Sequence, residues 1–299
     1  MSWFIFALLG YFLYALVTVS NKFLLRQRAT TRPLVFTFWV CLFSLLTFVL
    51  APFGLYWPGW SWLTFDILTG LVFFMSLLAF YKLLDINEAS RSSSVLGGLT
   101  PIAVLILSYF FLGSTLGYFQ LLAFIFLVAG GFLISLEKVR HSFRERIRGF
   151  NFLFLTIIFH AIYFVMLKYL FNYQDFITGF VWSRLGLVLG ALILLLYGPW
   201  RREIKSSMQK ATAGVSSLML GSKVVAGLGS LLVSLAVFQG DVSLVNALKG
   251  LEYVFLFLLT VLLSKRFPDI LHEKLSRGII LQKTIAIILI CAGLVLIVL

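Results

Sequence analysis

The sequence predicts an all-α polytopic membrane protein with ten transmembrane helices, arranged as two inverted five-helix repeats. Three observations lead to this fold class: the composition is very apolar, the apolar residues form ten runs of membrane-spanning length, and the second half of the chain repeats the first. Of the 299 residues, 61% are hydrophobic, only 12% are charged and 32 are Phe. A soluble domain of this size could not bury so much apolar surface.

The ten runs follow from the length that a bilayer demands. A spanning helix needs about 20 consecutive apolar residues, and each run ends where charge, Pro and Gly cluster. The predicted spans are 2–21, 34–55, 63–82, 92–112, 116–136, 150–171, 176–197, 216–238, 243–264 and 279–298. The first run has no basic leader and no small-residue cleavage site, which indicates a retained span and not a signal peptide. No connection is long enough for a soluble domain.

The net charge of +13 comes from basic residues that are concentrated in connections on one side of the membrane, so it does not indicate a nucleic-acid partner. Lys and Arg concentrate in the odd-numbered connections, and the even-numbered connections have none. Basic loops usually face the cytoplasm, so we expect the odd connections inside and both termini outside, in a bacterial or archaeal plasma membrane. The uncharged aromatic connection "YWPGWSW" (56–62) suits the opposite interface.

The internal repeat relates spans 1–5 to spans 6–10. Without a gap, "SSSVLGGLTPIAVLILSYFFLG" (92–113) aligns with "LVNALKGLEYVFLFLLTVLLSK" (244–265), and further matched pairs are Tyr14 with His160, Trp39 with Trp182 and Gln120 with Gln282. The predicted units are 1–137 and 150–299, joined by a basic cytoplasmic linker, 138–149. Five spans is an odd number, so the second copy enters the membrane from the opposite side. Inverted repeats of this kind are a transporter architecture, with the site near the midplane.

The five-plus-five arrangement, the span "LGGLTPIAVLILSYFFLG" and the segment "HEKLSRGIILQKTIAIILICAG" resemble the drug/metabolite transporter superfamily, specifically its EamA-like members. The resemblance covers essentially the whole chain and implies a ten-helix transporter. Three features depart from the family pattern. The acidic residue that such proteins usually have just after span 4 is missing from this chain, which has "LGSTLG" there, and the acid appears only in the second repeat, as Glu273. Tyr253 replaces the equivalent of Pro101, and the charge distribution places the termini outside.

Polar residues inside the spans are the candidate site. A charge at the bilayer centre costs about 2.5–3.5 kcal/mol on insertion scales, so such groups normally face the bundle interior. The predicted substrate-binding residues are Arg184, Lys249, Glu252, Lys223, His160, Asn246, Tyr253, Trp182 and Tyr14. The residues predicted to allow close helix packing or sliding are Gly97, Gly98, Pro101, Gly250 and Gly227.

Several of these residues also have a purely structural interpretation. Lys249 and Glu252 are three residues apart, so they could neutralise each other or could orient a cationic group toward a cavity. Lys223 could extend to the interface, and His160 could be a hydrogen-bonding packing residue. Arg184 could pair with Glu252, but it lies deep in its span and is the strongest candidate for a substrate contact.

The charge balance of the predicted site is cationic. We therefore expect a small anionic or zwitterionic metabolite, such as an amino acid or a phosphorylated or carboxylated compound, carried by alternating access. A lipid-intermediate flippase or an intramembrane enzyme acting on a phosphate headgroup is the alternative.

The sequence has no phosphate-binding loop and no paired metal-ligand His, which argues against ATP-driven transport, metal-dependent catalysis and a bound cofactor. Cys41 and Cys291 are isolated within spans and are interpreted as packing residues. The expected partners are the substrate and the lipid bilayer. A monomer would already contain both halves of the pathway.

Overall fold

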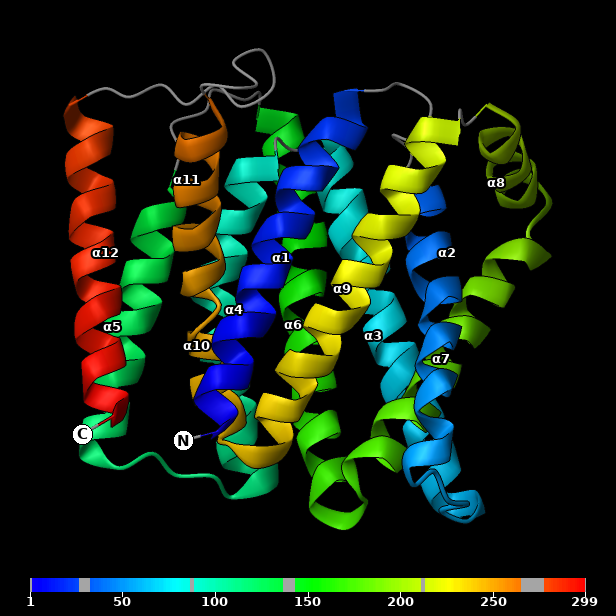
Figure 1. Ribbon diagram of the computed structural model, residues 1–299, viewed down its shortest axis with the longest axis horizontal. Helices are drawn as coiled ribbons and strands as arrows, with labels where there is room; N and C mark the ends of the chain where they lie inside the picture. Colours follow the sequence, from blue (N-terminus) through cyan, green and yellow to red (C-terminus); the bar gives the residue numbers. More distant parts are fainter. Residues whose placement is uncertain are drawn as a thin grey trace.

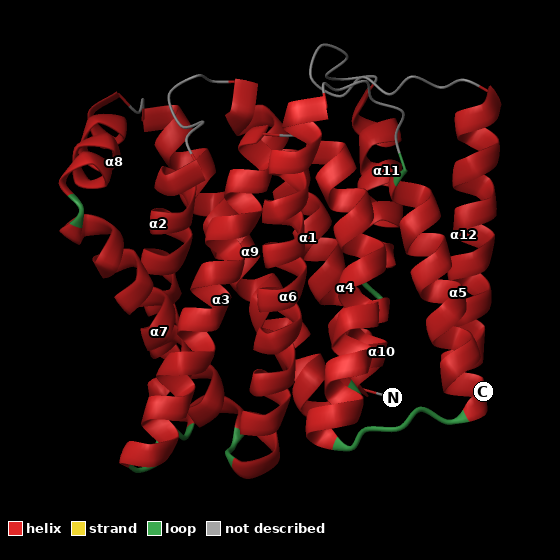
Figure 2. Ribbon diagram, turned by 180° about the vertical axis from the view of Figure 1, so that it is seen from behind, coloured by secondary structure: helices red, strands yellow, loops and turns green. Residues whose placement is uncertain are grey.

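The computed structural model describes residues 2–26, 33–86, 89–136, 143–210, 213–264 and 277–298, and every regular element in these ranges is a helix (Figures 1 and 2). The elements are α1 (Ser2–Arg26), α2 (Pro33–Phe43), the 3₁₀ helix η1 (Ser44–Phe53), α3 (Trp60–Ile86), α4 (Ala89–Leu112), α5 (Tyr118–Ser135), α6 (Phe143–Tyr173), α7 (Phe176–Leu196), α8 (Gly198–Lys210), α9 (Ala213–Gln239), α10 (Val242–Ala247), α11 (Gly250–Ser264) and α12 (Arg277–Val298).

The chain is a polytopic membrane protein. Among the described residues, 8 helices are long and apolar enough to cross a membrane, and the shorter apolar segments Thr37–Phe53 and Leu96–Leu112 fall in the predicted spans 34–55 and 92–112. The count of ten crossing helices, and their relation as inverted repeats, stay predictions.

Both termini lie at one end of the bundle (Figure 1). The described connections 54–59, 113–117, 174–175 and 240–241, which contain no Lys or Arg, lie at the same end. We call this the termini end. The described parts of the basic connections begin or finish at the opposite end, so the uncharged and basic connections are separated along the bundle axis.

Two predicted spans are not uniform α-helices. The second continues from α2 into η1, where Ser44 Oγ donates to Cys41 O at 2.6 Å and Thr47 Oγ1 donates to Ser44 O at 2.7 Å. Such bonds from side chains to nearby carbonyls compete with the α-helical pattern. The ninth span divides into α10 and α11 around Leu248 and Lys249.

Two predicted connections are partly helical. The linker predicted at 138–149 belongs to α6 from Phe143 onward, and most of 198–214 is α8. Pro199 fits the first turn of α8, where it costs no hydrogen bond. Ile204 is buried against α2 and α7, whereas Arg201 and Lys205 are exposed, so α8 is amphipathic. Residues 138–142 of the predicted linker and the connection containing Glu273 lie outside the described residues.

Glycines bring several helix pairs into backbone contact. A Cβ on Gly70 of α3 would lie 1.9 Å from Ser183 O and 2.8 Å from the Cα of Gly186 on α7. A Cβ on Gly250 of α11 would lie 2.9 Å from the Cα of Gly131 on α5. Small residues permit such close approach of helices within a membrane.

The packing differs between helix pairs that the predicted repeat makes equivalent. α3 packs extensively against α7, whereas α9 and α2, which would be their counterparts, share few contacts. Likewise α4 packs against α5, but α11 and α12 share few contacts. The two halves are therefore packed differently.

Lys168 of α6 holds the last turn of α9 at the termini end. Its Nζ donates to the carbonyl oxygens of Val237, Phe238 and Gly240 at 3.0, 3.3 and 2.9 Å. These are terminal carbonyls that a helix leaves without internal partners, and a cation near a helix C-terminus is also favoured by the helix dipole.

Replacing Lys168 with Met is expected to destabilise the protein by about 1–3 kcal/mol, because the carbonyl oxygens at the end of α9 lose a charged donor. The midpoint of thermal unfolding in detergent would fall. Lys205→Met, on the exposed side of α8, serves as the control and should leave the midpoint unchanged. Equal midpoints for both variants would contradict the role of Lys168.

Candidate functional site

Arg184 is the centre of the candidate site. It is 3% exposed, on α7, and its Cζ lies 4.1 Å from the ring centroid of Phe180, one turn earlier, and 5.7 Å from that of Phe73 on α3. Its Nη2 donates to Ser230 Oγ of α9 at 3.3 Å. This is the single side-chain hydrogen bond of the guanidinium among the described residues, although the group has five N–H donors. Donors therefore remain for an additional acceptor.

Tyr14 of α1 connects Arg184 to Glu252, the second charged group of the site. Its hydroxyl interacts with Ser230 and lies within electrostatic range of both Arg184 and Glu252. The position of the ring follows from helix packing, since a Cβ on Gly229 of α9 would lie 3.2 Å from it. One turn further along α1, Thr18 Oγ1 donates to Glu252 Oε1 at 3.2 Å.

Lys249 lies where α10 gives way to α11. Its backbone N–H bonds to Asn246 O at 3.1 Å, three residues back, instead of to Val245 O. The chain is therefore tightened to a 3₁₀ pattern at this turn. The Val245 oxygen that this leaves available accepts a bond from the Tyr11 hydroxyl of α1 at 2.9 Å. Tyr11 thus stabilises the turn that presents Lys249.

Lys249 lies within electrostatic range of two other titratable groups, the Glu252 carboxylate and the His160 imidazole. Within the described part of the chain, no ion pair joins Lys249 to Glu252 or Arg184 to Glu252, and the hydrogen bond of the carboxylate is the one from Thr18. The predicted neutralising pair is therefore not formed in this structure, and the lysine ammonium has no hydrogen-bond partner among the described side chains.

His160 of α6 is a further titratable residue near Lys249. Its Nδ1 lies 3.1 Å from Ser76 Oγ of α3. The imidazole is surrounded by the rings of Phe73, Tyr163 and Phe164, and Phe73 stacks on Tyr163 with centroids 4.1 Å apart. This wall is apolar and aromatic, whereas Arg184, Lys249 and Glu252 supply charge.

The structure thus brings together Tyr14, His160, Arg184, Lys249 and Glu252 from α1, α6, α7 and the junction of α10 with α11. Tyr253 is buried on α11 and occupies the space that a side chain at Gly97 would need, since a Cβ there would lie 2.6 Å from its Cε2. Together these residues form what we call the central polar cluster.

Other predicted residues lie elsewhere. Trp182 Nε1 donates to Tyr56 O at 2.9 Å, and the ring contacts Phe48 and Trp57, in an aromatic group next to the termini-end connection 54–59. Asn246 is buried, and its Nδ2 donates to Val242 O within its own helix at 2.9 Å. Lys223 is buried on α9, seven residues before Ser230.

The predicted packing residues also differ in their surroundings. A Cβ on Gly98 would lie 2.8 Å from the Phe132 ring, and Gly250 lies against Gly131, so both positions are closely packed. Pro101 lies buried inside α4. A Cβ on Gly227 would meet open space.

Sequence reasoning missed Tyr11, Thr18, Ser76 and Asp66. Tyr11, Tyr14 and Thr18 follow one another at i, i+3 and i+7, a spacing that places them on one face of α1 and could have identified them together. Asp66, fully buried in α3, is an acidic residue within the predicted span 63–82, and that position could have identified it. Among the described residues, no group of three or more His, Cys, Asp or Glu could hold a metal ion.

Comparison with known proteins found a similar structure and a family model that matches part of the chain. A solved structure titled "Crystal structure of protein" has a TM-score of 0.68 to this chain, at 17% sequence identity, over 99% of this chain and 94% of the other. A likeness at that identity shows a shared fold alone. Comparison with curated proteins found no match. The family model of the EamA-like transporter family matches residues 1–136. The first part of the chain is therefore similar to the EamA-like transporter family, which is part of the drug/metabolite transporter superfamily.

Proposed function

We propose that the protein is a secondary transporter, and not an enzyme, that moves a small anionic or zwitterionic metabolite across the membrane. The observation that carries this proposal is the guanidinium of Arg184, which is buried inside the bundle with one side-chain hydrogen bond among the described residues. A cation in that setting favours an anionic group as its partner, and carboxylates and phosphates fit the planar guanidinium.

The remaining groups of the central polar cluster support the same substrate class. Lys249 adds a second cation, and Glu252 is the acid placed beside it. In a zwitterion, an acidic group would bind near Arg184 or Lys249 while an ammonium approaches Glu252. Phe73, Phe180 and Tyr163 supply apolar surface for the rest of the molecule.

The proposed mechanism is alternating access between two inverted five-helix repeats. The second repeat, 150–299, would be EamA-like as the first is. In this arrangement the close contact of α3 with α7 and the sparse contact of α9 with α2 are two states of equivalent helix pairs. The basic connections would face the cytoplasm, with both termini outside, and one chain would suffice as a monomer. Labelling of terminal tags in intact cells tests the orientation.

A ligand screen tests the substrate class. We expect amino acids, carboxylates or sugar phosphates to raise the thermal unfolding midpoint of the purified protein, and the same compounds to cross the membrane of proteoliposomes. Organic cations are expected to do neither. Stabilisation by organic cations alone would contradict the cationic site. Transfer of a labelled phospholipid between leaflets, without flux of any soluble compound, would favour the flippase instead.

A further inference from the structure

Asp66 is a buried acid away from the central polar cluster. It lies on the second turn of α3, near the termini end, and is 0% exposed. Beside it the rings of Trp62 and Phe65 contact Tyr173 and Tyr169 of α6. An ionised carboxylate is very costly to bury in such surroundings unless a cation compensates its charge.

No cation in the described part of the chain pairs with this carboxyl group. Its hydrogen-bond partner among the described residues is Gln174, whose Nε2 lies 3.5 Å from Oδ1 and 3.4 Å from Oδ2 of Asp66. Lys168 donates hydrogen bonds to carbonyl oxygens at the end of α9. Arg184 donates to Ser230 and lies over the rings of Phe73 and Phe180. Among the titratable side chains that the structure describes on the elements packed against α3, none forms a hydrogen bond or ion pair with Asp66. These side chains are Cys41 on α2, Tyr109 on α4, His160, Tyr163, Lys168, Tyr169 and Tyr173 on α6, Asp175 in the α6–α7 connection and Arg184 on α7.

Gln174 provides a second, independent observation. It is 6% exposed, and its Oε1 is a buried acceptor without a hydrogen-bond partner among the described residues. A buried carbonyl oxygen without a donor costs about 1–3 kcal/mol. One additional proton on the carboxyl group would remove the buried charge and would add an O–H donor next to the carboxamide. Acid and carboxamide could then each donate to the other.

We propose that Asp66 is a proton-binding site, occupied in the conformation described here and paired with the Gln174 carboxamide. Protonation adds one H⁺ from the aqueous phase to the carboxylate and requires no other reactant. The pair joins α3 to the connection between α6 and α7. Loss of the proton leaves a buried carboxylate, and hydration of that charge favours separation of these helices at the termini end.

The proton bound at Asp66 would be the coupling ion of the proposed transporter. The coupling rests on the proposed function, whereas the protonation of Asp66 does not. Proton binding would favour the closed arrangement of α3 with α6 and α7, and proton release would favour the open one. Substrate movement would then be linked to a proton gradient through a residue that does not contact the substrate.

Infrared difference spectroscopy tests the proton directly, without a substrate. The wild-type protein at neutral pH is expected to show the C=O band of a protonated carboxylic acid, and Asp66→Asn should lose it. Asn preserves the size of the side chain and can still pair with Gln174, so folding should be retained. Asp175→Asn is the matched control: this acid is exposed a single residue after Gln174, and its replacement should leave the band unchanged. A difference spectrum of wild type minus Asp66→Asn that lacks this C=O band overturns the proposal.

Transport measurements test the coupling separately. With any compound that the ligand screen identifies, Asp66→Asn should preserve exchange between equal concentrations but lose about tenfold or more of the accumulation driven by a pH gradient. If Asp66→Asn accumulates substrate as wild type does, the coupling role is wrong even where the infrared band is present. If no compound is transported by wild type, the proposed function fails while the infrared result still stands.

Discussion

Replacing Arg184 with Ala is expected to lower the rate of anion exchange in proteoliposomes about 10- to 100-fold. A hydrogen bond to a charged group contributes about 1.5–3 kcal/mol, which corresponds to that range of affinity. The buried guanidinium has one side-chain hydrogen bond, to Ser230, among the described residues, so its remaining N–H groups are available for a carboxylate or phosphate. Arg184→Lys should retain part of the activity, because it keeps the charge but loses the planar, two-pronged donor geometry.

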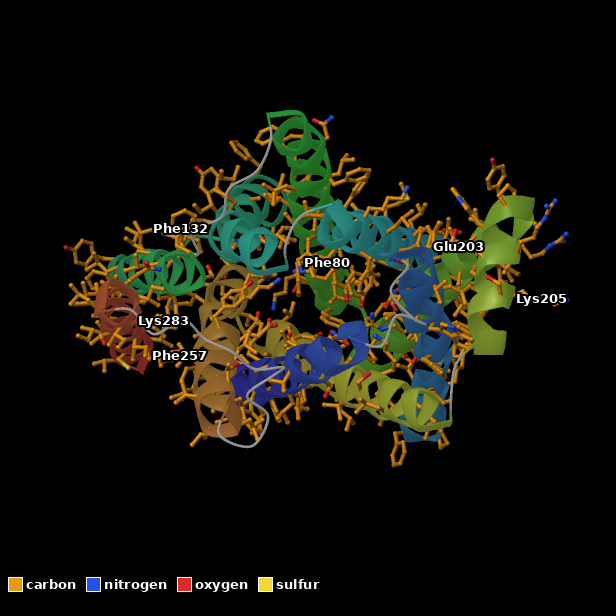
Figure 3. All side chains as sticks on the ribbon, turned by 90° about the horizontal axis from the view of Figure 1, so that it is seen from above. Phe80, Phe132, Glu203, Lys205, Phe257 and Lys283 are labelled. Carbon is orange, nitrogen blue, oxygen red and sulfur yellow. The ribbon has the colours of Figure 1, made fainter. Side chains whose placement is uncertain are left out.

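A buried cation on another helix provides the control for Arg184. Lys283 of α12 is 7% exposed, and its Nζ lies 4.3 Å from the ring centroid of Phe257 on α11, at the edge of the bundle (Figure 3). Lys283→Met should leave exchange unchanged. An Arg184→Ala protein that exchanges substrate at the wild-type rate, with an unchanged elution profile and unfolding midpoint, would show that Arg184 is not a substrate ligand.

The Gly70→Ala substitution is expected to give the largest loss of stability. The added Cβ would lie 1.9 Å from Ser183 O and 2.8 Å from the Cα of Gly186, and both obstacles are backbone atoms that cannot rotate away. α3 and α7 would have to separate, which would disturb the packing along both helices. Overpacking costs about 1–3 kcal/mol and occasionally more, and we expect the upper part of that range or a failure to fold. The midpoint of thermal unfolding, or the yield of monodisperse protein, measures it.

Gly221→Ala serves as the matched control for this substitution. Gly221 also lies inside a helix, α9, but a Cβ there would have no atom within 4 Å. The change should be neutral, or stabilising by up to about 1 kcal/mol through helix propensity. A Gly70→Ala protein as stable as Gly221→Ala would mean that α3 and α7 do not approach as closely as described.

The positions of the helices could be predicted from the sequence because hydrophobic run length and charge are local signals. Described helices occupy all ten predicted runs, and the family match over residues 1–136 agrees with the resemblance stated from the motifs. The sequence predicts a connection at 198–214 because the charges of this segment interrupt the apolar pattern. Its one-sided apolar face, centred on Ile204, is nevertheless sufficient to pack a helix against α2 and α7.

The site was predictable in part, for a comparable reason. Charged residues deep in apolar runs must face the interior, so Arg184, Lys249 and Glu252 could be grouped without coordinates. The face of a helix that points inward is a tertiary property, however, and Trp182, two residues from Arg184, contacts Tyr56 instead of the cluster. The hydrogen bond from Tyr11 to the tightened turn depends on where α1 packs, which no pattern within a single span specifies.

Under the proposed alternating-access mechanism, the unequal packing of the two halves predicts the opposite conformation. If 1–137 and 150–299 share one fold, each half is a template for the other. Exchanging their internal arrangements would separate α3 from α7 and bring α9 onto α2. The packing of each half therefore predicts the packing of the other half in the opposite state. Spin labels on α2 and α9 should show a shorter separation in that state, and labels on α3 and α7 a longer one.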